Sequence, residues 1–347
     1  MRVQLTIPAD DWQRTRRAAR FAEAAGYDAL VSVELAHDPF LPLAVAVGET
    51  SRIGLATGIA LAFPRSPTSV AASAWALQLQ SRGRFTLGLG SQVKAHIERR
   101  FGASWSAPAP RLREYVEALR AVWRAWERRE PLHYEGEHYR LTLMTPEFSP
   151  PPSGLPPIPI HVAAVGPAML RMAGRSCDGV RLHGFATRRY LEQIALPELL
   201  RGLSESGRSR ERFEIAGGGF AVTAPDADAL AAAAEQIRYR IAFYGSTPAY
   251  REVLALHGWE ELGQRLHARS KRGEWSALAS EVPDEVLHGF AAIAPYEGIA
   301  AAVARRFAGV SDSVALELPA DTEPGLAREL VQELKALPQG FLGPGPP

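Results

Sequence analysis

The sequence predicts an α/β protein, a closed (β/α)8 TIM barrel with insertions after strands four and seven. Short runs rich in β-forming residues alternate with helical patterns along the chain, which is typical of parallel strands joined by helices. Eight such units form a barrel, whereas a doubly wound sheet usually has fewer strands. The eight predicted strands are 3–7, 29–33, 53–61, 85–90, 158–164, 179–183, 216–223 and 313–318. The seventh is the weakest, because it contains three consecutive glycines.

The first helices carry start and stop signals. A helical pattern over 12–25 stops at Gly26, a residue type that adopts the left-handed conformation at helix ends. Ser66 and Pro67 suit the N-cap and the first position of another helix, which ends near Gly83. These signals place one helix after the first predicted strand and another after the third.

Two stretches between predicted strands exceed ordinary loop length. The first, 91–157, contains two helical patterns and a hairpin pattern with Glu135 and Gly136 at its turn. The second, 241–290, separates the seventh strand from the last βα unit. Insertions of this kind commonly build the wall or lid of a barrel active site.

Composition limits the classes of function. The net charge of +1 comes from 39 basic and 38 acidic residues mixed along the chain, so we expect no binding to nucleic acid or anionic membrane. The single cysteine, Cys177, excludes an intramolecular disulfide and is expected to be a buried thiol. The histidines are too scattered for a metal site, so no metal is predicted.

We expect one domain over 1–335, followed by a flexible C-terminal tail over 336–347. The N-terminus does not resemble a secretory signal and no apolar run is long enough to span a bilayer, so a cytoplasmic protein is predicted. The expected partners are a small-molecule substrate and further copies of the chain, in a homodimer or larger homo-oligomer.

The active site of such a barrel lies at the carboxyl ends of its strands. The residues expected there are 34–38, 58–60, 90–96, 165–166 and 183–185. There, Gly166 and Pro167 join a strand to a helix whose free N–H groups and dipole suit a phosphate group, although Gly166 alone also explains a tight turn. Glu34, His37 and Asp38 follow the second strand and suit acid–base chemistry, although solvated loop residues are the alternative. Both alternatives stay open on these residues alone.

Aromatic residues form two groups. Three tryptophans at helical spacing, Trp75, Trp123 and Trp126, are predicted to lie in the core. Tyr244 and Tyr250, like the nearby Trp259, belong to the second insertion, where they either cover a flat ring or pack against the insertion itself.

Several motifs resemble those of the bacterial luciferase-like superfamily, particularly its coenzyme F-420 (deazaflavin) dependent oxidoreductases. The resemblance covers residues 1 to about 320. Its markers are AEAAGYDALVSVE at 22–34, HDPFLPLAVAVGETSRIGLATGI at 37–59, SRGRFTLGLGSQ at 81–92, HIERRFG at 96–102 and AAVGPAMLRMAGRSCDGV at 163–180. The segment IAFYGSTPAYREVLALHGW at 241–259 is similar to that of uncharacterised oxidoreductases of this group.

The resemblance implies a barrel with the flavin or deazaflavin ring at its C-terminal face. It implies a non-prolyl cis peptide at Gly58-Ile59 beneath the ring, and backbone donors at Val165 and Gly166 for the cofactor phosphate. The residues that it implies along the polyol side of the cofactor are Gly90, Ser91 and His96. The resemblance therefore favours phosphate binding over a mere tight turn at Gly166.

One position departs from the pattern of these relatives. Several F-420 dependent dehydrogenases have an acidic residue followed by a histidine after the second strand, but here Leu35 follows Glu34. Glu34 and His37 are therefore candidates for proton transfer, without a sugar-phosphate mechanism being implied. The leading hypothesis is hydride transfer between F-420 and a small organic substrate. The alternatives are an FMN-dependent monooxygenase and a non-catalytic barrel subunit.

Overall fold

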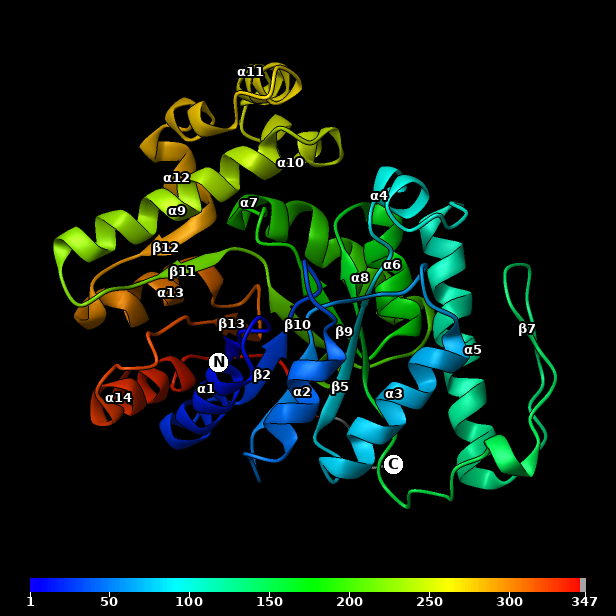
Figure 1. Cartoon of the computed structure of the whole chain (residues 1–347). Coiled ribbons are helices and arrows are strands. Elements are labelled where there is room, and N and C mark those ends of the chain that lie inside the picture. Colours follow the sequence, from blue (N-terminus) through cyan, green and yellow to red (C-terminus); the bar gives the residue numbers. More distant parts are fainter. Residues whose placement is uncertain (344–347) are drawn as a thin grey trace.

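The computed structural model describes residues 1–343 and shows a closed parallel β-barrel surrounded by helices (Figure 1). The barrel strands are β1 (Arg2–Thr6), β2 (Ala29–Ser32), β3 (Gly54–Thr57), β5 (Phe85–Gly90), β8 (Ile160–Ala164), β9 (Gly179–Leu182), β10 (Glu214–Gly217) and β13 (Ser313–Ala315). Each strand pairs in parallel with its neighbours, and pairing of β3 with β5 closes the ring. The predicted (β/α)8 fold is confirmed.

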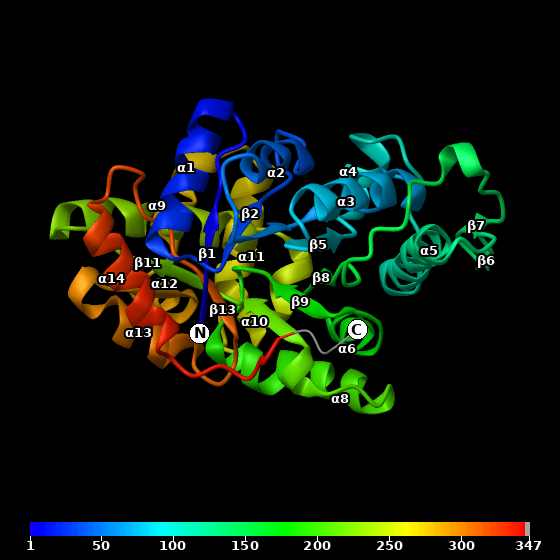
Figure 2. The same cartoon turned by 90° about the horizontal axis from the view of Figure 1, so that it is seen from below.

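A ring of helices surrounds the strands (Figure 2). These helices are α1 (Trp12–Ala25), α2 (Phe40–Val47), α3 (Pro67–Gln80), α5 (Pro108–Arg128), α6 (Pro167–Ser176), α7 (Arg188–Tyr190), α8 (Leu196–Glu205), α13 (Ile299–Phe307) and α14 (Pro324–Lys335). The predicted caps are confirmed, because Gly26 ends α1 with φ of 83° and the Ser66 side chain accepts a hydrogen bond from Ser69 N at the start of α3.

The apolar side chains of helices and strands form one core. Trp75, Trp123 and Trp126 are all buried, as predicted, and Trp75 packs edge-on against Trp126 with ring centroids 5.5 Å apart. Cys177 is also buried, and burial raises the pKa of its thiol to about 12. No helix within residues 1–343 is long and apolar enough to cross a membrane.

Between β5 and β8 the chain forms α4 (Lys94–Arg99), α5 and an antiparallel hairpin of β6 (Tyr134–Glu135) and β7 (Arg140–Leu141). The hairpin confirms the pattern seen in the sequence, and its turn is closed by a hydrogen bond from Gly136 N to Tyr139 O. In Figure 1 the hairpin lies on the outer side of α5.

Between β10 and β13 lie α9 (Ala227–Gly245), α10 (Arg251–Ala255), α11 (Glu260–Lys271) and α12 (Asp284–Phe290). Figure 1 shows α9, α10 and α11 at the upper end of the barrel, to which the arrows of β2 and β10 point. Further short segments are the strand β4 (Ala60–Leu61), the 3-10 turns Pro146–Phe148, Arg210–Arg212, Pro248–Tyr250, Trp275–Ala277, Ala279–Glu281 and Tyr296–Gly298, and the π-helical turn Leu191–Ala195.

Two strands differ from the prediction. The third, predicted as one strand over 53–61, is interrupted at Gly58-Ile59, which separates β3 from β4. The seventh, predicted as one strand over 216–223, changes sheets. It divides into β10, inside the barrel, and β11 (Phe220–Val222), which pairs with β12 (Ala291–Ile293) outside it. The three glycines between them have φ of 79°, 94° and 149°, which end the ladder and turn the chain outward. The buried Arg306 holds this turn through a hydrogen bond from Nη2 to Gly218 O of 2.8 Å.

The C-terminal segment after α14 returns to the N-terminal end of the barrel. Asp312 Oδ1 accepts hydrogen bonds from Gly340 N at 2.8 Å and Phe341 N at 3.1 Å, and the Phe341 side chain is buried. The first part of the segment that the sequence assigns to a tail is therefore anchored to the barrel, and residues 344–347 lie outside the described part.

Candidate functional site at the barrel mouth

The floor of the barrel mouth is formed by glycines from two neighbouring strands. The peptide bond Gly58-Ile59, just after β3, is cis, at the position that the sequence resemblance implies. A Cβ atom on Gly90 would lie 2.6 Å from Ile59 Cδ1 and 3.6 Å from Ala163 Cβ, so these three residues meet at the mouth. A side chain at position 90 would displace Ile59, and glycine keeps this part of the floor flat.

The guanidinium group of Arg181 lies inside the barrel, just below this floor. Arg181, on β9, donates a hydrogen bond from Nη1 to Gln4 Oε1 at 3.1 Å, and a Cβ on Gly58 would lie 3.5 Å from the same nitrogen. The carboxylate of Glu214, which accepts from Arg2 at 2.7 Å and from Gln4 at 3.4 Å, lies close enough to raise the pKa of Arg181 and so offsets part of the effect of burial. Burial lowers the pKa of Arg181 to about 10, which leaves it charged at neutral pH.

The N-terminus of α6 opens at the same end of the barrel. Gly166 is its N-cap with φ of −80° and ψ of 160°, and Pro167 is its first residue. A Cβ on Gly166 would meet nothing within 4 Å, so the space beside the first turn is open. The Tyr190 hydroxyl donates to Val165 O and fixes the approach to the helix. Pro167 has no N–H group and Met169 N donates to Gly166 O at 3.1 Å, so the N–H groups of Gly166 and Ala168, together with the helix dipole, make this a candidate anion site.

Glu34, a candidate from the sequence, is held in an ion pair. Its carboxylate accepts from Arg65 Nη1 at 2.7 Å and from Leu61 N at 2.7 Å, and its side chain is 7% exposed. Arg65 also donates to Asp38 at 3.2 Å. Through Arg65, Glu34 and Asp38 thus connect the loop after β2 to the loop before α3.

The other predicted residues lie around the mouth but do not contact one another through any hydrogen bond described for residues 1–343. His37 is exposed in the loop after β2, and His96 is exposed on the short helix α4. Ser91 follows β5 directly and donates to Gln92 O at 3.2 Å.

The sequence places His183 at the carboxyl end of a strand but assigns it no role. It directly follows β9, two residues after Arg181. Its Nδ1 accepts a hydrogen bond from Phe185 N at 2.9 Å, which assigns the ring proton to Nε2. The ring stacks on Tyr250, with centroids 4.8 Å apart, and meets Tyr244 edge-on at 4.3 Å. Burial lowers the pKa of His183 to about 4, so the imidazole is neutral at pH 7.

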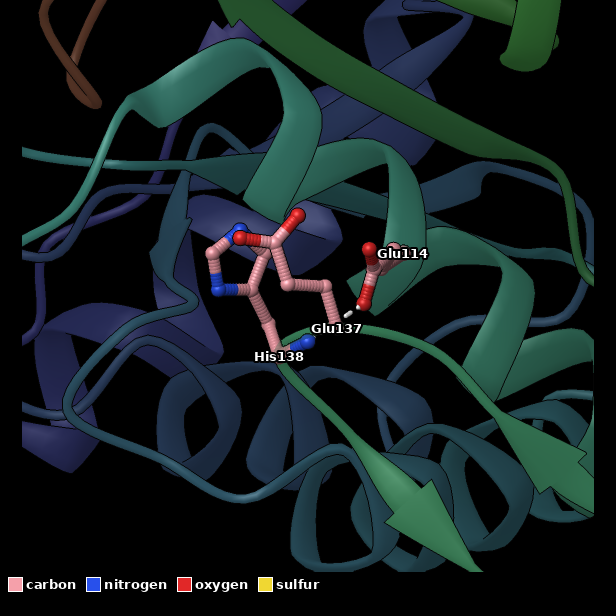
Figure 3. A group of neighbouring side chains, drawn as sticks. All are labelled: Glu114, Glu137 and His138. Carbon is pink, nitrogen blue, oxygen red and sulfur yellow. Dashed lines mark hydrogen bonds between the residues drawn. The ribbon is translucent and has the colours of Figure 1, made fainter.

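A separate group of possible metal ligands lies away from the mouth, between α5 and the hairpin (Figure 3). Atoms of Glu114, Glu137 and His138 come within 4.8 Å of one another. The buried Glu114 accepts a hydrogen bond from His138 N at 2.7 Å, shown as the dashed line in Figure 3. This bond anchors the hairpin to α5, which gives Glu114 a structural role without an ion.

The fold and these motifs can be compared with known proteins. Residues 2–312 match the model of a family described as luciferase-like monooxygenase. The chain belongs to this family. The luciferase-like protein is also 47% identical, over 301 residues, to an uncharacterised protein of Mycobacterium tuberculosis, an alignment that covers 87% of this chain and 88% of the other.

Two further relatives have named activities. The luciferase-like chain is 29% identical over 249 residues to the 5,10-methylenetetrahydromethanopterin reductase of Archaeoglobus fulgidus, with 70% of each chain covered. Its structure is similar to that of the coenzyme F-420 dependent tetrahydromethanopterin reductase of Methanopyrus kandleri, with a TM-score of 0.77, 22% identity and coverage of 96% and 97% of the two chains. This second similarity supports the barrel fold.

Proposed function

We propose that this luciferase-like protein is an oxidoreductase that binds coenzyme F-420 and transfers hydride to or from a small organic substrate. The observation that carries the proposal is the open N-terminus of α6 beside a glycine-lined floor. Gly166 leaves the space next to the helix free, while Gly90 and Ile59 meet Ala163 at the floor. A flat ring with a phosphate-bearing tail matches both features.

The residues of the mouth fit such a cofactor. The N–H groups around Val165 and Gly166 would hold its phosphate, and the residues after β5, Gly90 and Ser91, would lie along the chain that joins phosphate and ring. When bound, a deazaflavin supplies a two-electron hydride carrier. The protein itself contributes the orientation of the ring, the anion site and the exclusion of water by the helices above the mouth.

Proton transfer is proposed for the loop after β2. His37 is exposed there, and its ring is available to a substrate, whereas Glu34 would first have to leave Arg65. The Arg65 ion pair therefore favours His37 over Glu34 for the proton-handling role.

A titration of cofactor-free protein with F-420, and separately with FMN, tests the proposal. Fluorescence and heat are followed under the same conditions. The proposal predicts micromolar or tighter binding of F-420 and at least tenfold weaker binding of FMN. Preference for FMN would replace it with a flavin-dependent monooxygenase, and binding of neither would favour a non-catalytic barrel.

A further inference from the structure

Three neutral hydrogen-bonding groups meet where the second insertion covers β9. His183 comes from the strand end, Tyr244 from the last turn of α9 and Tyr250 from the turn that follows. The two tyrosine rings are 5.9 Å apart and nearly perpendicular, and both contact the histidine ring. All three residues are half-buried, so each keeps part of its surface accessible.

The polar atoms of this cluster lack partners. Within residues 1–343 no hydrogen bond is described for His183 Nε2 or for the hydroxyls of Tyr244 and Tyr250, and none of these atoms is among the fully enclosed polar atoms. His183 Nδ1 is already used by Phe185 N, so Nε2 is a donor. Three available O–H or N–H groups on aromatic walls are therefore left for a ligand.

The location of the cluster ties it to the barrel mouth. Side chains alternate along a strand, and His183 is the first residue beyond β9, so continuing the alternation by one residue directs it to the same side as Arg181. Arg181 points into the barrel, where it reaches Gln4 and lies near Gly58. His183 is thus directed toward the mouth, one step nearer its opening than Arg181, and the tyrosines close over it from the insertion.

The electrostatics of the cluster select an uncharged ligand. Burial lowers the pKa of His183 to about 4, so its ring is neutral at pH 7 and offers a hydrogen-bond donor without a charge. Burial also raises the pKa of Tyr250, which keeps its hydroxyl protonated. A carboxylate or phosphate would lose its water here without gaining a cation, whereas a carbonyl oxygen accepts hydrogen bonds at little cost of desolvation.

We infer that His183, Tyr244 and Tyr250 form the substrate-binding site, and that they bind the oxygen of an uncharged carbonyl compound, or of the corresponding alcohol, with an apolar body. His183 Nε2 donates to this oxygen and the tyrosine rings pack against the apolar part. This inference specifies the substrate of the proposed function. The reaction rests on that proposed function, whereas the binding of the carbonyl compound does not.

Acetophenone is the probe, with benzoate as its charged counterpart and ethylbenzene as the counterpart without an acceptor oxygen. Ligand-detected NMR titrations measure the dissociation constants in cofactor-free protein and again with F-420. Wild type is expected to bind acetophenone more tightly than either counterpart. In protein labelled with 15N-histidine, the Nε2 proton signal of His183 is expected to shift with acetophenone and not with ethylbenzene.

Two variants separate the donor from the structural role of the ring. His183→Asn keeps an acceptor oxygen for Phe185 N but lacks a donor at the Nε2 position, and should weaken acetophenone binding about fivefold to tenfold. His183→Gln places an amide N–H farther out and should recover most of this loss. His257→Asn is the matched control, since His257 is in the same insertion and bonds to Thr187 at 2.8 Å.

The outcomes distinguish this inference from the proposed function. If His183→Asn binds acetophenone as tightly as wild type, or if benzoate binds more tightly than acetophenone, the inference is overturned. If F-420 does not bind but the ketone still depends on His183, the cofactor proposal fails and the carbonyl site stands. Thermal unfolding of each variant shows whether a loss of binding follows from a loss of fold.

Discussion

Gly166→Ala should weaken cofactor binding without weakening the fold. The backbone at Gly166 has φ of −80° and ψ of 160°, which alanine adopts freely, and the new methyl group would meet nothing within 4 Å. The lower entropy of the unfolded chain stabilises such a variant by roughly 0.4–1 kcal/mol, and replacing glycine by alanine at an N-cap offsets roughly 0.5–1 kcal/mol. The free energy of unfolding should therefore change by less than about 1 kcal/mol.

The same methyl group would occupy the open space at the first turn of α6, where we propose that the phosphate binds. Losing one hydrogen bond to a charged group costs about 1.5–3 kcal/mol, which is about 10- to 150-fold in the dissociation constant. Fluorescence titration with F-420 measures this loss. The phosphate-free deazaflavin, which ends at the polyol, should bind equally well to wild type and Gly166→Ala.

Gly48→Ala is the matched control, because Gly48 also has an ordinary backbone conformation, with φ of −70° at the end of α2. It should bind F-420 like wild type. Equal affinity of Gly166→Ala and wild type for F-420 would refute the phosphate site, and equal losses for F-420 and its phosphate-free analogue would show that the methyl group acts on the ring instead.

Three further predictions follow from the side chains. Glu34→Gln removes the charge paired with Arg65 and should lower the free energy of unfolding in urea by about 1–3 kcal/mol; unchanged stability with lost turnover would instead indicate a catalytic carboxylate. Burial lowers the pKa of His161 to about 3, whereas the same histidine in the unfolded chain is protonated below about pH 6.5. Acid therefore favours the unfolded chain, and the free energy of unfolding should fall from pH 6.5 toward pH 4 by up to about 1.4 kcal/mol per pH unit. His161→Gln should reduce that slope, and an identical slope would contradict the assignment. Cys177, with its pKa raised to about 12, should react with a thiol reagent only on unfolding; rapid labelling of native protein would disprove its burial.

The fold follows from patterns that act locally. Alternating strands and helices predicted all eight barrel strands, because each buried strand is a short apolar run bounded by turn residues. Two of them are divided: the third is interrupted at Gly58-Ile59 between β3 and β4, and in the seventh β10 and β11 belong to different sheets. The glycine conformations at 217–219 depend on Arg306, almost ninety positions later, and no local pattern contains that contact.

The site was predictable in position but not in its chemistry. Parallel strands bring their carboxyl ends together, which located the loop after β2 and the start of α6. The ion pair of Glu34 with Arg65 and the tautomer of His183 depend on contacts that sequence spacing does not reveal. The tyrosines over His183 come from an insertion about sixty residues away, whose folded position periodicity does not determine.

The most direct test of the central claim is a crystal structure of the protein with bound F-420. We expect the ring at the barrel mouth beside Ile59 and Gly90, with a phosphate oxygen within hydrogen-bonding distance of the N–H groups of Gly166 or Ala168. Binding elsewhere, for example in the cavity of about 500 Å³ between α1 and the residues after β13, would contradict it.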